Sequence, residues 1–468
     1  MLIPDTLHSS SSPAVYDAAA RRWWSYAQLC IAVEALQLQL PMRKCLAFCF
    51  CGTDVTTIIN YLALRGAGHA VALLSGENAI IHQPLIERYK PELLLASCPL
   101  PFATDGYVSS AHDSSLVYKA AEEAIVELDQ DLAVLLSTSG TTGSPKFVRL
   151  SERNVQSNAD SIRQALALTA DDRAMCSLPF QYSYGLSVLN SHLRAGASLV
   201  VTPHGMMNAE YWSACREAEC TSMAGVPYSY QVLHRLRLDD LRVPRLRTLT
   251  QAGGKLNTEL ITEFHLLMEQ RQGRFFVMYG QTEATARMAI LPATDLPRKL
   301  GSAGFPIPGG SFAIKREDGT LTEESGVQGE LVYSGPNVML GYATARADLA
   351  NGDQLGGMLS TGDLCQLDEE GYLFVAGRMK RDAKVLGMRI NLDEVEAMLR
   401  KHGPTAVVAG ADKLHVYCEY SAKADLTDLR HQLAIHLNLN HAAFDFHRME
   451  KLPTTQSGKI DYAAIQNL

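Results

Sequence analysis

The sequence predicts an α/β protein in which a large N-terminal domain of wound α/β layers and a β-rich subdomain is followed by a small mobile α+β C-terminal domain. Three observations predict this class. Apolar strand-like runs alternate with helical patterns through residues 45–130, as in a parallel sheet covered by helices. Glycine-rich, β-like runs fill residues 300–376. The 468 residues exceed what one hydrophobic core usually accommodates, so at least two domains are expected.

The first β-α-β unit begins with an apolar run that contains Cys45, Cys49 and Cys51. Thr53 or Asp54 can cap the helix that follows this run. A Cys-x-Cys pair can bind a metal, but the sequence offers no second pair or histidine cluster beside it, so buried apolar thiols are favoured. The expected elements are strands over residues 45–51, 70–74 and 93–96, and helices that end at residue 64 and cover residues 80–89.

A polar stretch, residues 137–146 with the sequence Ser-Thr-Ser-Gly-Thr-Thr-Gly-Ser-Pro-Lys, follows another apolar run. Gly140 and Gly143 permit turns in which N–H groups and hydroxyls converge on phosphate oxygens, and Lys146 adds a positive charge. The spacing excludes a Walker loop, because Pro145 stands where that motif has glycine. Taken alone, the stretch fits a nucleotide-phosphate clamp and an ordinary polar turn equally well.

A strand over residues 147–150 and a helix capped by Ser151 are expected next. The segment 178–186, with the sequence Leu-Pro-Phe-Gln-Tyr-Ser-Tyr-Gly-Leu, then concentrates aromatic residues. These aromatics fit either a hydrophobic core or the wall of a small-molecule pocket. The apolar face of the helix is predicted to consist of Val155, Ala159, Ile162 and Leu166.

Two later runs, residues 248–255 and 275–284, read as strands that end in glycines and polar side chains. The carboxyl ends of strands are where α/β sheets hold ligands. Tyr279 can stack on a planar base, and Glu283 is a hard oxygen ligand suited to Mg²⁺ beside phosphates. A glutamate at such a position, taken alone, is more often a solvated surface residue.

The β-rich region contains strand-like runs over residues 329–334 and 371–376, with Ser-Thr-Gly-Asp at residues 360–363 between them. Asp363 can accept hydrogen bonds from both hydroxyls of a ribose. An aspartate in a Thr-Gly-Asp turn is also common as a plain Asx-turn, so both interpretations remain at this point.

A separate α+β domain is expected to begin near Arg381. Asn391 is predicted to cap its first helix, with Glu394 at the capping-box position. A polar loop near the end of the chain carries Lys459, which would read as a surface lysine if it stood alone. The other expected elements are strands over residues 406–409 and 414–420 and a helix over residues 426–437.

Composition narrows the class of protein further. The net charge of −8 and the lack of a basic run argue against a nucleic-acid partner. The first residues lack the pattern of a signal peptide, and no apolar segment approaches the roughly 18 residues of a membrane span. Ten cysteines in a chain of this length are not a disulfide scaffold, so a cytoplasmic location is expected.

Seven motifs, taken in this order, resemble those of the adenylate-forming (AMP-binding) superfamily of acyl-CoA synthetases, nonribosomal peptide synthetase adenylation domains and firefly luciferase. Each motif alone is weak, but seven in order along nearly the whole chain are specific. The motifs are residues 137–146, 279–283 (Tyr-Gly-Gln-Thr-Glu), 329–330 (Gly-Glu), 360–363, 377–378 (Gly-Arg), 384–390 (Lys-Val-Leu-Gly-Met-Arg-Ile) and 457–459 (Ser-Gly-Lys).

The resemblance implies an acid–thiol ligase that uses ATP and Mg²⁺. A carboxylate attacks the α-phosphate and gives an acyl-adenylate and pyrophosphate; the thiol of coenzyme A or of a carrier-protein phosphopantetheine then displaces AMP. It also implies an N-terminal AMP-binding and acyl-substrate domain over residues 1–379 and a mobile lid over residues 380–468. Rotation about a hinge near Lys380 would withdraw Lys459 and bring the loop around Gly387 to the thiol acceptor.

The same resemblance assigns the site residues. Lys459 would bridge the carboxylate and the α-phosphate, Lys146 would bind the outer phosphates, Thr282 the α-phosphate, and Glu283 the Mg²⁺ ion. The acyl pocket would be formed by Tyr182, Tyr184, Gly185 and Tyr228. The residues expected to bind ATP or AMP are Thr138, Ser139, Gly140, Thr141, Thr142, Gly143, Lys146, Gly253, Gly254, Tyr279, Gly280, Gln281, Thr282, Asp363, Arg378 and Lys459.

Several positions depart from the family pattern. Phe147 follows the first lysine where the family often has glycine, and Tyr182 stands where many acyl-CoA synthetases carry histidine. Residues 179–185 lack the aspartate that amino-acid-activating members use, which disfavours an amino-acid substrate, and the tyrosines favour a short or aromatic acid. A shortened segment between Lys401 and Leu414 leaves both coenzyme A and a carrier protein acting in trans as acceptors.

The predicted function is therefore ATP-dependent activation of a carboxylic acid followed by thioester formation. The alternatives are a stand-alone adenylation enzyme for an amino or aryl acid in a natural-product pathway, an oxygenase of the luciferase type, and a non-catalytic nucleotide-binding regulator. Retention of both Lys146 and Lys459 argues against the regulator, because a pure binding protein has no need of the second lysine.

Overall fold

The computed structural model describes residues 2–121, 127–137, 146–385, 388–410, 413–419, 426–437, 439–455, 458–466 and 468. These residues form two compact units. Unit 1 contains the described residues up to 137 together with residues 146–311 and 333–359, and unit 2 contains residues 312–332 and the described residues from 360 onward. The boundary expected between residues 379 and 380 and the hinge near Lys380 remain predictions.

The first sheet of unit 1 has eight strands in the order β20-β9-β8-β4-β3-β5-β7-β6. Its centre is parallel, because β3 pairs in parallel with both β4 and β5, and β4 pairs in parallel with β8. The predicted strands of this region are therefore confirmed. The bounds are β3 Leu46–Cys51, β4 Ala70–Ser75, β5 Leu93–Ala96, β6 Tyr107–His112, β7 Ser115–Ala120, β8 Leu132–Ser137, β9 Phe147–Ser151 and β20 Gly341–Ala343.

Local signals set the helices around this sheet. Asp54 accepts a hydrogen bond from the Thr57 N–H at 2.7 Å and so caps α2 (Val55–Gly66), as expected. Ser151 and Asn154 form a reciprocal capping box at the start of α4 (Glu152–Ala165), whose residues Val155, Ala159 and Ile162 are buried. The predicted helix over residues 80–89 begins as a 3-10 turn and continues as α3 (Gln83–Tyr89).

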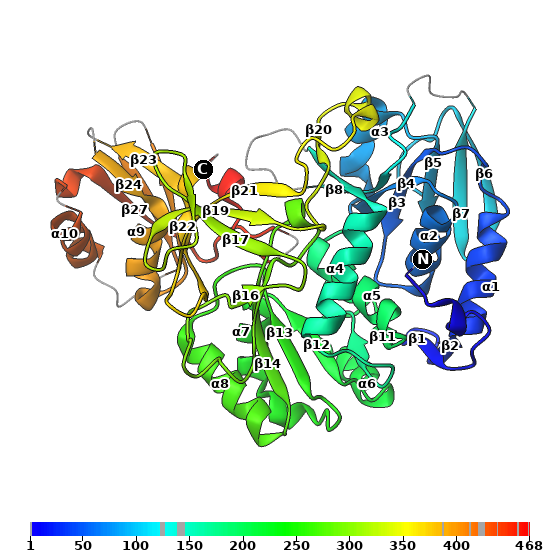
Figure 1. Ribbon diagram of the computed structural model, residues 1–468, viewed down its shortest axis with the longest axis horizontal. Helices are drawn as coiled ribbons and strands as arrows, with labels where there is room; N and C mark the ends of the chain where they lie inside the picture. Colours follow the sequence, from blue (N-terminus) through cyan, green and yellow to red (C-terminus); the bar gives the residue numbers. More distant parts are fainter. Residues whose placement is uncertain are drawn as a thin grey trace. The chain divides into compact units, whose positions relative to one another are not determined.

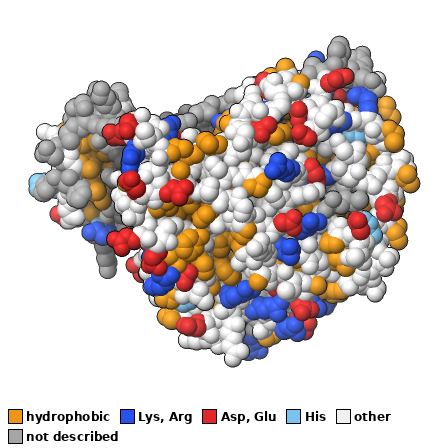
Figure 2. All heavy atoms as spheres, viewed as in Figure 1, with side chains coloured by type: hydrophobic (Ala, Val, Ile, Leu, Met, Phe, Trp, Pro, Cys, Tyr) orange, Lys and Arg blue, Asp and Glu red, His pale blue; other side chains and the backbone are white. Residues whose placement is uncertain are grey.

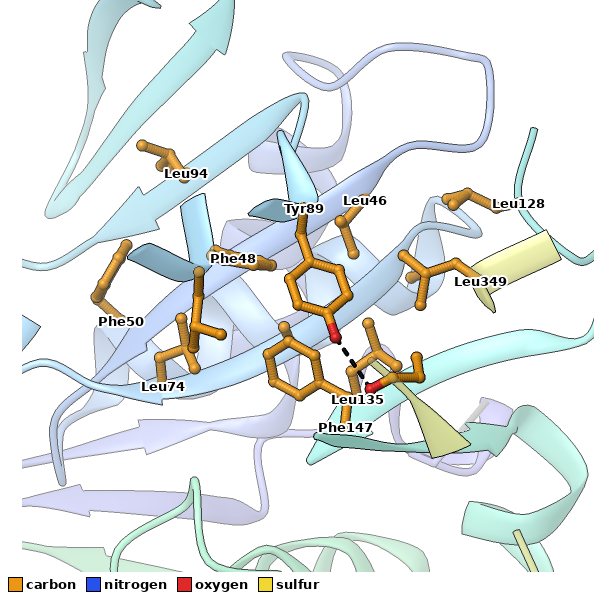
Figure 3. Close-up of a cluster of buried hydrophobic side chains, with 14 of the residues drawn as sticks. Leu46, Phe48, Phe50, Leu74, Tyr89, Leu94, Leu128, Leu135, Phe147 and Leu349 are labelled. Atoms are coloured by element: carbon orange, nitrogen blue, oxygen red, sulfur yellow. Dashed lines mark hydrogen bonds between the residues drawn. The ribbon is translucent and has the colours of Figure 1, made fainter. Parts of the chain in front are cut away.

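The core of this sheet anchors the residue that follows Lys146. Phe147 is 1% exposed and packs edge-on against Tyr89, with ring centroids 5.0 Å apart, and against Phe48 (Figure 3). The Tyr89 hydroxyl donates to the backbone oxygen of Ala343 in β20 at 2.9 Å. The phenylalanine that departs from the family pattern is therefore a core residue that ties β9 to its neighbours.

The second sheet of unit 1 has nine strands in the order β16-β15-β14-β13-β12-β10-β11-β1-β2. Helices α4 and α5 pack together; α4 contacts β8 and β9 of the first sheet, and α5 contacts β10 and β11 of the second (Figure 1). The strands are β1 Pro13–Asp17, β2 Arg22–Ser25, β10 Arg173–Met175, β11 Ser198–Val201, β12 Ser222–Gly225, β13 Thr248–Gln251, β14 Arg274–Tyr279, β15 Ala289–Leu291 and β16 Phe305–Pro306. The remaining helices of unit 1 are α1 Tyr26–Gln37, α5 Ser183–Ala195, α6 Ala209–Glu217, α7 Pro227–Leu236 and α8 Thr258–Gln270.

Unit 2 contains a five-stranded sheet in the order β18-β17-β19-β21-β22, which confirms the β-rich subdomain. Residues 360–363, expected as a turn, lie within the long strand β21, where Gly362 has a φ of +69°. The Asx-turn interpretation of Asp363 is therefore wrong. The bounds are β17 Ser311–Lys315, β18 Leu321–Thr322, β19 Gln328–Ser334, β21 Met358–Leu367 and β22 Leu373–Arg378.

The rest of unit 2 is the predicted α+β region. A three-stranded sheet in the order β25-β26-β27 packs one face against α9 and α10 through Val395, Val416 and Leu433. The side chains of Asn391 and Glu394, expected as a capping pair, lie outside the described residues. The bounds are β23 Asp382–Val385, β24 Met388–Asn391, α9 Leu392–Leu399, β25 Thr405–Ala409, β26 Leu414–Cys418, α10 Leu426–His436, β27 Phe444–Arg448 and α11 Tyr462–Gln466.

The surface charges and the burial of the cysteines agree with the expectations from the sequence. On the face shown in Figure 2, lysine and arginine side chains lie among aspartate and glutamate side chains. None of the ten cysteines forms a disulfide; nine are buried, including Cys45, Cys49 and Cys51 in the first sheet, and Cys98 is exposed. The expectation of buried apolar thiols is confirmed.

Candidate active site

Lys146 stands at the start of β9, directly before the buried Phe147. Its Nζ atom lies 3.4 Å from the centroid of the Tyr342 ring, a cation–π contact. Tyr342 belongs to β20, which pairs antiparallel with β9 and places Tyr342 opposite Val148. Strand pairing thus fixes the lysine on an aromatic platform at the edge of the first sheet.

The Tyr342 hydroxyl donates to Oε1 of Glu283 at 2.7 Å. Glu283 lies in a short 3-10 turn, η4 (Thr282–Ala284), that follows β14 of the second sheet, and its backbone oxygen accepts from the Met339 N–H at 2.9 Å. The structure therefore brings both residues to one tyrosine, with Lys146 over the ring and Glu283 at the hydroxyl. Glu283 is half-buried, and its carboxylate is an oxygen ligand of the kind that would hold a Mg²⁺ ion.

The residues around Glu283 form a continuous polar edge of the second sheet. Oγ1 of Thr282 lies 3.2 Å from Oγ of Ser183, at the start of α5, and the Gln281 amide approaches the Tyr279 hydroxyl at 3.5 Å. Gly280 must be glycine, because a Cβ there would lie 1.8 Å from the Ala286 backbone oxygen. This close approach holds the turn after β14 in place.

Gly253 and Gly254 follow the neighbouring strand β13, which is parallel to β14. The two strands therefore end at the same edge of the sheet, and Gly253 and Gly254 lie at that edge together with Tyr279. Gly253 has a φ of +84°, which favours glycine.

The tyrosines expected at the acyl pocket differ in burial. Tyr184 is buried and donates to the Thr250 backbone oxygen at 2.8 Å, as does another buried tyrosine, Tyr230, so both belong to the core. Tyr182 is half-buried and meets Tyr184 edge-on, with ring centroids 6.2 Å apart, and burial raises the pKa of its hydroxyl to about 12. Tyr228 is 45% exposed. Gly185 lies in the first turn of α5, where a Cβ would lie 2.2 Å from the Pro179 backbone oxygen.

The sequence analysis missed Arg287, which is 2% exposed. Its guanidinium carbon lies 4.2 Å from the centroid of the Tyr184 ring, and it donates to Oγ of Ser187. No ion pair joins it to a carboxylate among the described residues, its Nε has no hydrogen-bond partner there, and burial lowers the pKa of the guanidinium. The sequence signal was an arginine directly before the apolar run Met288–Leu291.

In unit 2, Asp363 and Arg378 lie opposite each other on β21 and β22, and Nε of Arg378 lies 3.1 Å from Oδ1 of Asp363. Asp363 is 3% exposed, whereas Arg378 is exposed. The backbone N–H of Arg378 donates to Oδ2 of Asp393 at 2.8 Å. The structure thus joins the two residues expected at the ribose.

Lys459 is exposed on a hairpin of unit 2 that an antiparallel bridge between Thr454 and Ile460 closes. The Thr455 N–H donates to the Lys459 backbone oxygen at 2.7 Å, and Gly458 has a φ of +74°. Seven expected site residues and the side chain of Lys380 lie outside the described residues. These seven are Thr138, Ser139, Gly140, Thr141, Thr142, Gly143 and Gly387.

These observations point to one class of enzyme. A cation and a carboxylate share one tyrosine where strands of two α/β sheets meet, which suits an enzyme that positions ATP and Mg²⁺, and the small unit carries a lysine suited to a second anion. The arrangement is that of an adenylate-forming ligase.

The profile of the family described as AMP-binding enzyme matches residues 64–343, and the chain belongs to this family. It is 30% identical to oxalate–CoA ligase of Arabidopsis thaliana over 75% of this chain and 70% of that protein. It is 29% identical to 2-succinylbenzoate–CoA ligase of Bacillus licheniformis over 87% of this chain and 88% of that protein. The protein is thus an ATP-dependent acid–thiol ligase, as predicted.

Solved structures agree in fold. The o-succinylbenzoate CoA synthetase of Bacillus subtilis, in complex with its acyl-adenylate, superposes with a TM-score of 0.79 at 23% identity and covers 98% of this chain and 96% of that one. ATP-bound MatB from Rhodopseudomonas palustris gives a TM-score of 0.78 at 22% identity over 99% and 97%. The predicted combination of a large N-terminal and a small C-terminal domain is confirmed. Among the described helices, we find none with the length and apolar character of a membrane span.

Proposed function

We propose that Lys146, Thr282, Glu283 and Lys459 carry the adenylation half-reaction, and that the acid is short or aromatic. The observation that carries this proposal is the contact chain from Lys146 through Tyr342 to Glu283. Lys146 binds the outer phosphates of ATP, and Glu283 holds the Mg²⁺ ion. When bound, the ion neutralises charge on the phosphate oxygens.

Two anions, the substrate carboxylate and the α-phosphate, must approach each other in this half-reaction. Lys459 stabilises the charge shared between them, and the Thr282 hydroxyl donates to the α-phosphate. Residues 380–468 move about Lys380 between the half-reactions, so Lys459 acts in the first step and the loop around Gly387 in the second. Exposure of Lys459 on a hairpin of the smaller unit supports this division of labour.

Two groups of residues bind the nucleoside. Gly253, Gly254 and Tyr279 frame the adenine, with Gly280 and Gln281 beside it. Asp363 and Arg378 bind the ribose hydroxyls, and their ion pair keeps the buried carboxylate compensated before the nucleotide arrives.

The acid lies against Tyr182, Gly185 and Tyr228, with Tyr184 behind them. Half-buried and exposed tyrosines present flat apolar surface with a polar tip, which suits a compact or aromatic acid rather than a long alkyl chain. The relatives of this chain include ligases for oxalate, 2-succinylbenzoate and ferulate, which supports a substrate in this range.

Coenzyme A is the thiol acceptor that most relatives support. A carrier protein acting in trans is the other candidate. It is supported by the similarity to tyrocidine synthase 3, which is 26% identical over 88% of this chain. The matched part is 7% of that protein. We place the enzyme in the cytoplasm because none of its ten cysteines forms a disulfide. Recovery in the soluble fraction of gently lysed cells, beside a cytoplasmic marker enzyme, would test the location.

Pyrophosphate release tests the substrate. Purified protein with ATP and Mg²⁺ is given oxalate, malonate, 2-succinylbenzoate, ferulate, benzoate, an amino acid or a long-chain fatty acid. We expect release with at least one short or aromatic acid and none when a chelator is in excess. Preference for the long-chain acid would contradict the proposed pocket. With the active acid, thioester formation on coenzyme A and on a phosphopantetheinylated carrier then identifies the acceptor.

A further inference from the structure

Three metal-ligating side chains gather on one face of the small sheet in unit 2. Strands β26 and β27 are parallel, with His415 opposite Asp445 and Tyr417 opposite His447. Because side chains alternate along a strand, these four residues project from the same face. The opposite face carries Val416 and Phe444, which belong to the core formed with α9 and α10.

The distances suit a single ion. His415, Asp445 and His447 each offer one ligand atom, and these atoms all lie within 4.8 Å of one another. Nδ1 of His415 and Nε2 of His447 are hydrogen-bonded at 3.2 Å, a contact that an ion bound by both nitrogens would replace. Two nitrogens bound to zinc at about 2.0–2.1 Å in a tetrahedral site lie about 3.3 Å apart. The observed separation is therefore close to that between two ligands of one tetrahedral ion.

Neighbouring groups hold the two imidazoles in place. The His447 ring stacks on Tyr417, with centroids 4.6 Å apart and planes at 18°, and the His415 and His447 rings are nearly parallel, at 26°. At Gly410, a Cβ would lie 2.6 Å from Nε2 of His415, so the chain passes closely over that nitrogen while Nδ1 faces His447. The ligand atoms are thus oriented before any ion binds.

We propose that His415, Asp445 and His447 bind one divalent transition-metal ion, with zinc as the preferred occupant. Two imidazoles and one carboxylate form a mixed nitrogen–oxygen donor set that zinc accepts, whereas Mg²⁺ and Ca²⁺ prefer oxygen ligands alone. All three residues are half-buried, so solvent reaches the cluster and a water molecule completes the coordination. The site involves none of the residues assigned to ATP.

Occupancy of this site bears on the hairpin that carries Lys459. The face that bears His415 and His447 also bears Tyr417, which packs in a cluster with Leu452 and Ile465 and with the partly buried Ile460. Directly after β27, the Met449 N–H donates to the Cys418 backbone oxygen at 2.9 Å. An ion that links β26 to β27 therefore stabilises the strands on which the hairpin is built.

Zinc titration of the full-length protein tests the proposal. Metal-free protein competes with a chromophoric chelator in excess Mg²⁺, so that carboxylate sites for Mg²⁺ are filled. We expect one zinc ion per chain. Loss of an outer-shell partner alone lowers metal affinity about 10- to 100-fold, so Asp445→Asn and His447→Gln should each weaken binding at least about tenfold. His441→Gln is the matched control, because His441 is an exposed histidine of the same region.

Two further measurements keep the result clear. Zinc should raise the unfolding temperature of the wild-type protein and of His441→Gln, but not that of Asp445→Asn, which preserves the shape of the side chain. Bound cobalt should lack the near-ultraviolet absorption of a thiolate ligand. Equal zinc affinity in Asp445→Asn, His447→Gln and the control, thiolate absorption, or absence of stoichiometric binding to the wild type would each overturn the proposal.

Discussion

Lys146 and Lys459 are both cations that the adenylation step is expected to use, yet the structures that support them differ. Lys146 is followed by a phenylalanine that is 1% exposed, and its ammonium lies on Tyr342 of a paired strand. Lys459 is exposed on a hairpin closed by one bridge. The first lysine is fixed by a large core, whereas the second depends on local structure. This difference suits a division between holding ATP and promoting one chemical step.

Burial accounts for the rigidity of the first lysine. Burying a phenylalanine side chain contributes about 1.5–3 kcal/mol, and the edge-on contact of Phe147 with Tyr89 adds about 0.5–1.5 kcal/mol. The backbone at Lys146 therefore cannot shift without loss of these contacts.

Lys459→Ala should give the largest effect. Without the cation between the carboxylate and the α-phosphate, adenylation should fall by about 10²-fold or more, because charge that develops in the transition state loses its partner. Thioester formation from a supplied acyl-adenylate should be nearly unchanged. Single-turnover assays of the two half-reactions measure both. Equal losses in both would contradict the proposed division between them.

Lys146→Met should act mainly on ATP binding. It removes the charge and keeps an apolar stem, and a hydrogen bond to a charged group contributes about 1.5–3 kcal/mol, so the KM for ATP should rise about 10- to 100-fold. Lys401→Met, at an exposed lysine of unit 2, is the control for both lysines. A fall in kcat with an unchanged KM would show that Lys146 acts in the chemical step instead.

Arg287→Met separates stability from activity. Replacing a buried cation that has no carboxylate partner among the described residues by an apolar side chain should leave the free energy of unfolding unchanged or raise it. Adenylation should fall about tenfold, because the guanidinium positions Tyr184 behind the acyl pocket by a desolvated cation–π contact that contributes about 1.5 kcal/mol. Urea unfolding and pyrophosphate release measure the two quantities. A large loss of stability with unchanged adenylation per folded molecule would assign Arg287 to the core alone.

Tyr342→Phe should give the smallest effect. The ring under Lys146 stays, but the hydroxyl that orients Glu283 is lost, at a cost of about 1 kcal/mol. The Mg²⁺ concentration for half-maximal activity should therefore rise about fivefold, with the KM for ATP at saturating Mg²⁺ little changed. Tyr342→Ala, which also removes the platform, should raise that KM as well. An unaltered Mg²⁺ requirement in Tyr342→Phe would mean that the hydroxyl does not position the carboxylate.

Local signals explain which parts of the fold were predictable. Asp54 and Ser151 stand at helix starts, and the fully buried strands β3, β4 and β8 read as uninterrupted apolar runs. The hairpin β6–β7 and the strands β1 and β2 gave no such signal. β6, for example, has no buried residue, so its pairing depends on backbone hydrogen bonds that any sequence can make.

The site residues that lie in sequence motifs could be predicted, whereas the contacts that depend on strand pairing could not. Motifs located Lys146, Glu283, Asp363 and Lys459, whereas Tyr342 meets Lys146 only because β20 pairs with β9 from a distant part of the chain. Arg287 likewise gains its role from Tyr184, on a different element. Such contacts depend on tertiary packing, which a single sequence does not reveal.

The burial of nine cysteines makes selective labelling of the native enzyme possible. Cys98, which follows β5 in unit 1, is the exposed thiol among the ten, so a thiol-reactive dye should label the native enzyme at one position. A second cysteine at Lys401, in unit 2, would then allow a donor–acceptor pair to report the separation of the two units during turnover. The native chain thus already supplies one of the two fluorescence attachment points needed to test the proposed domain motion.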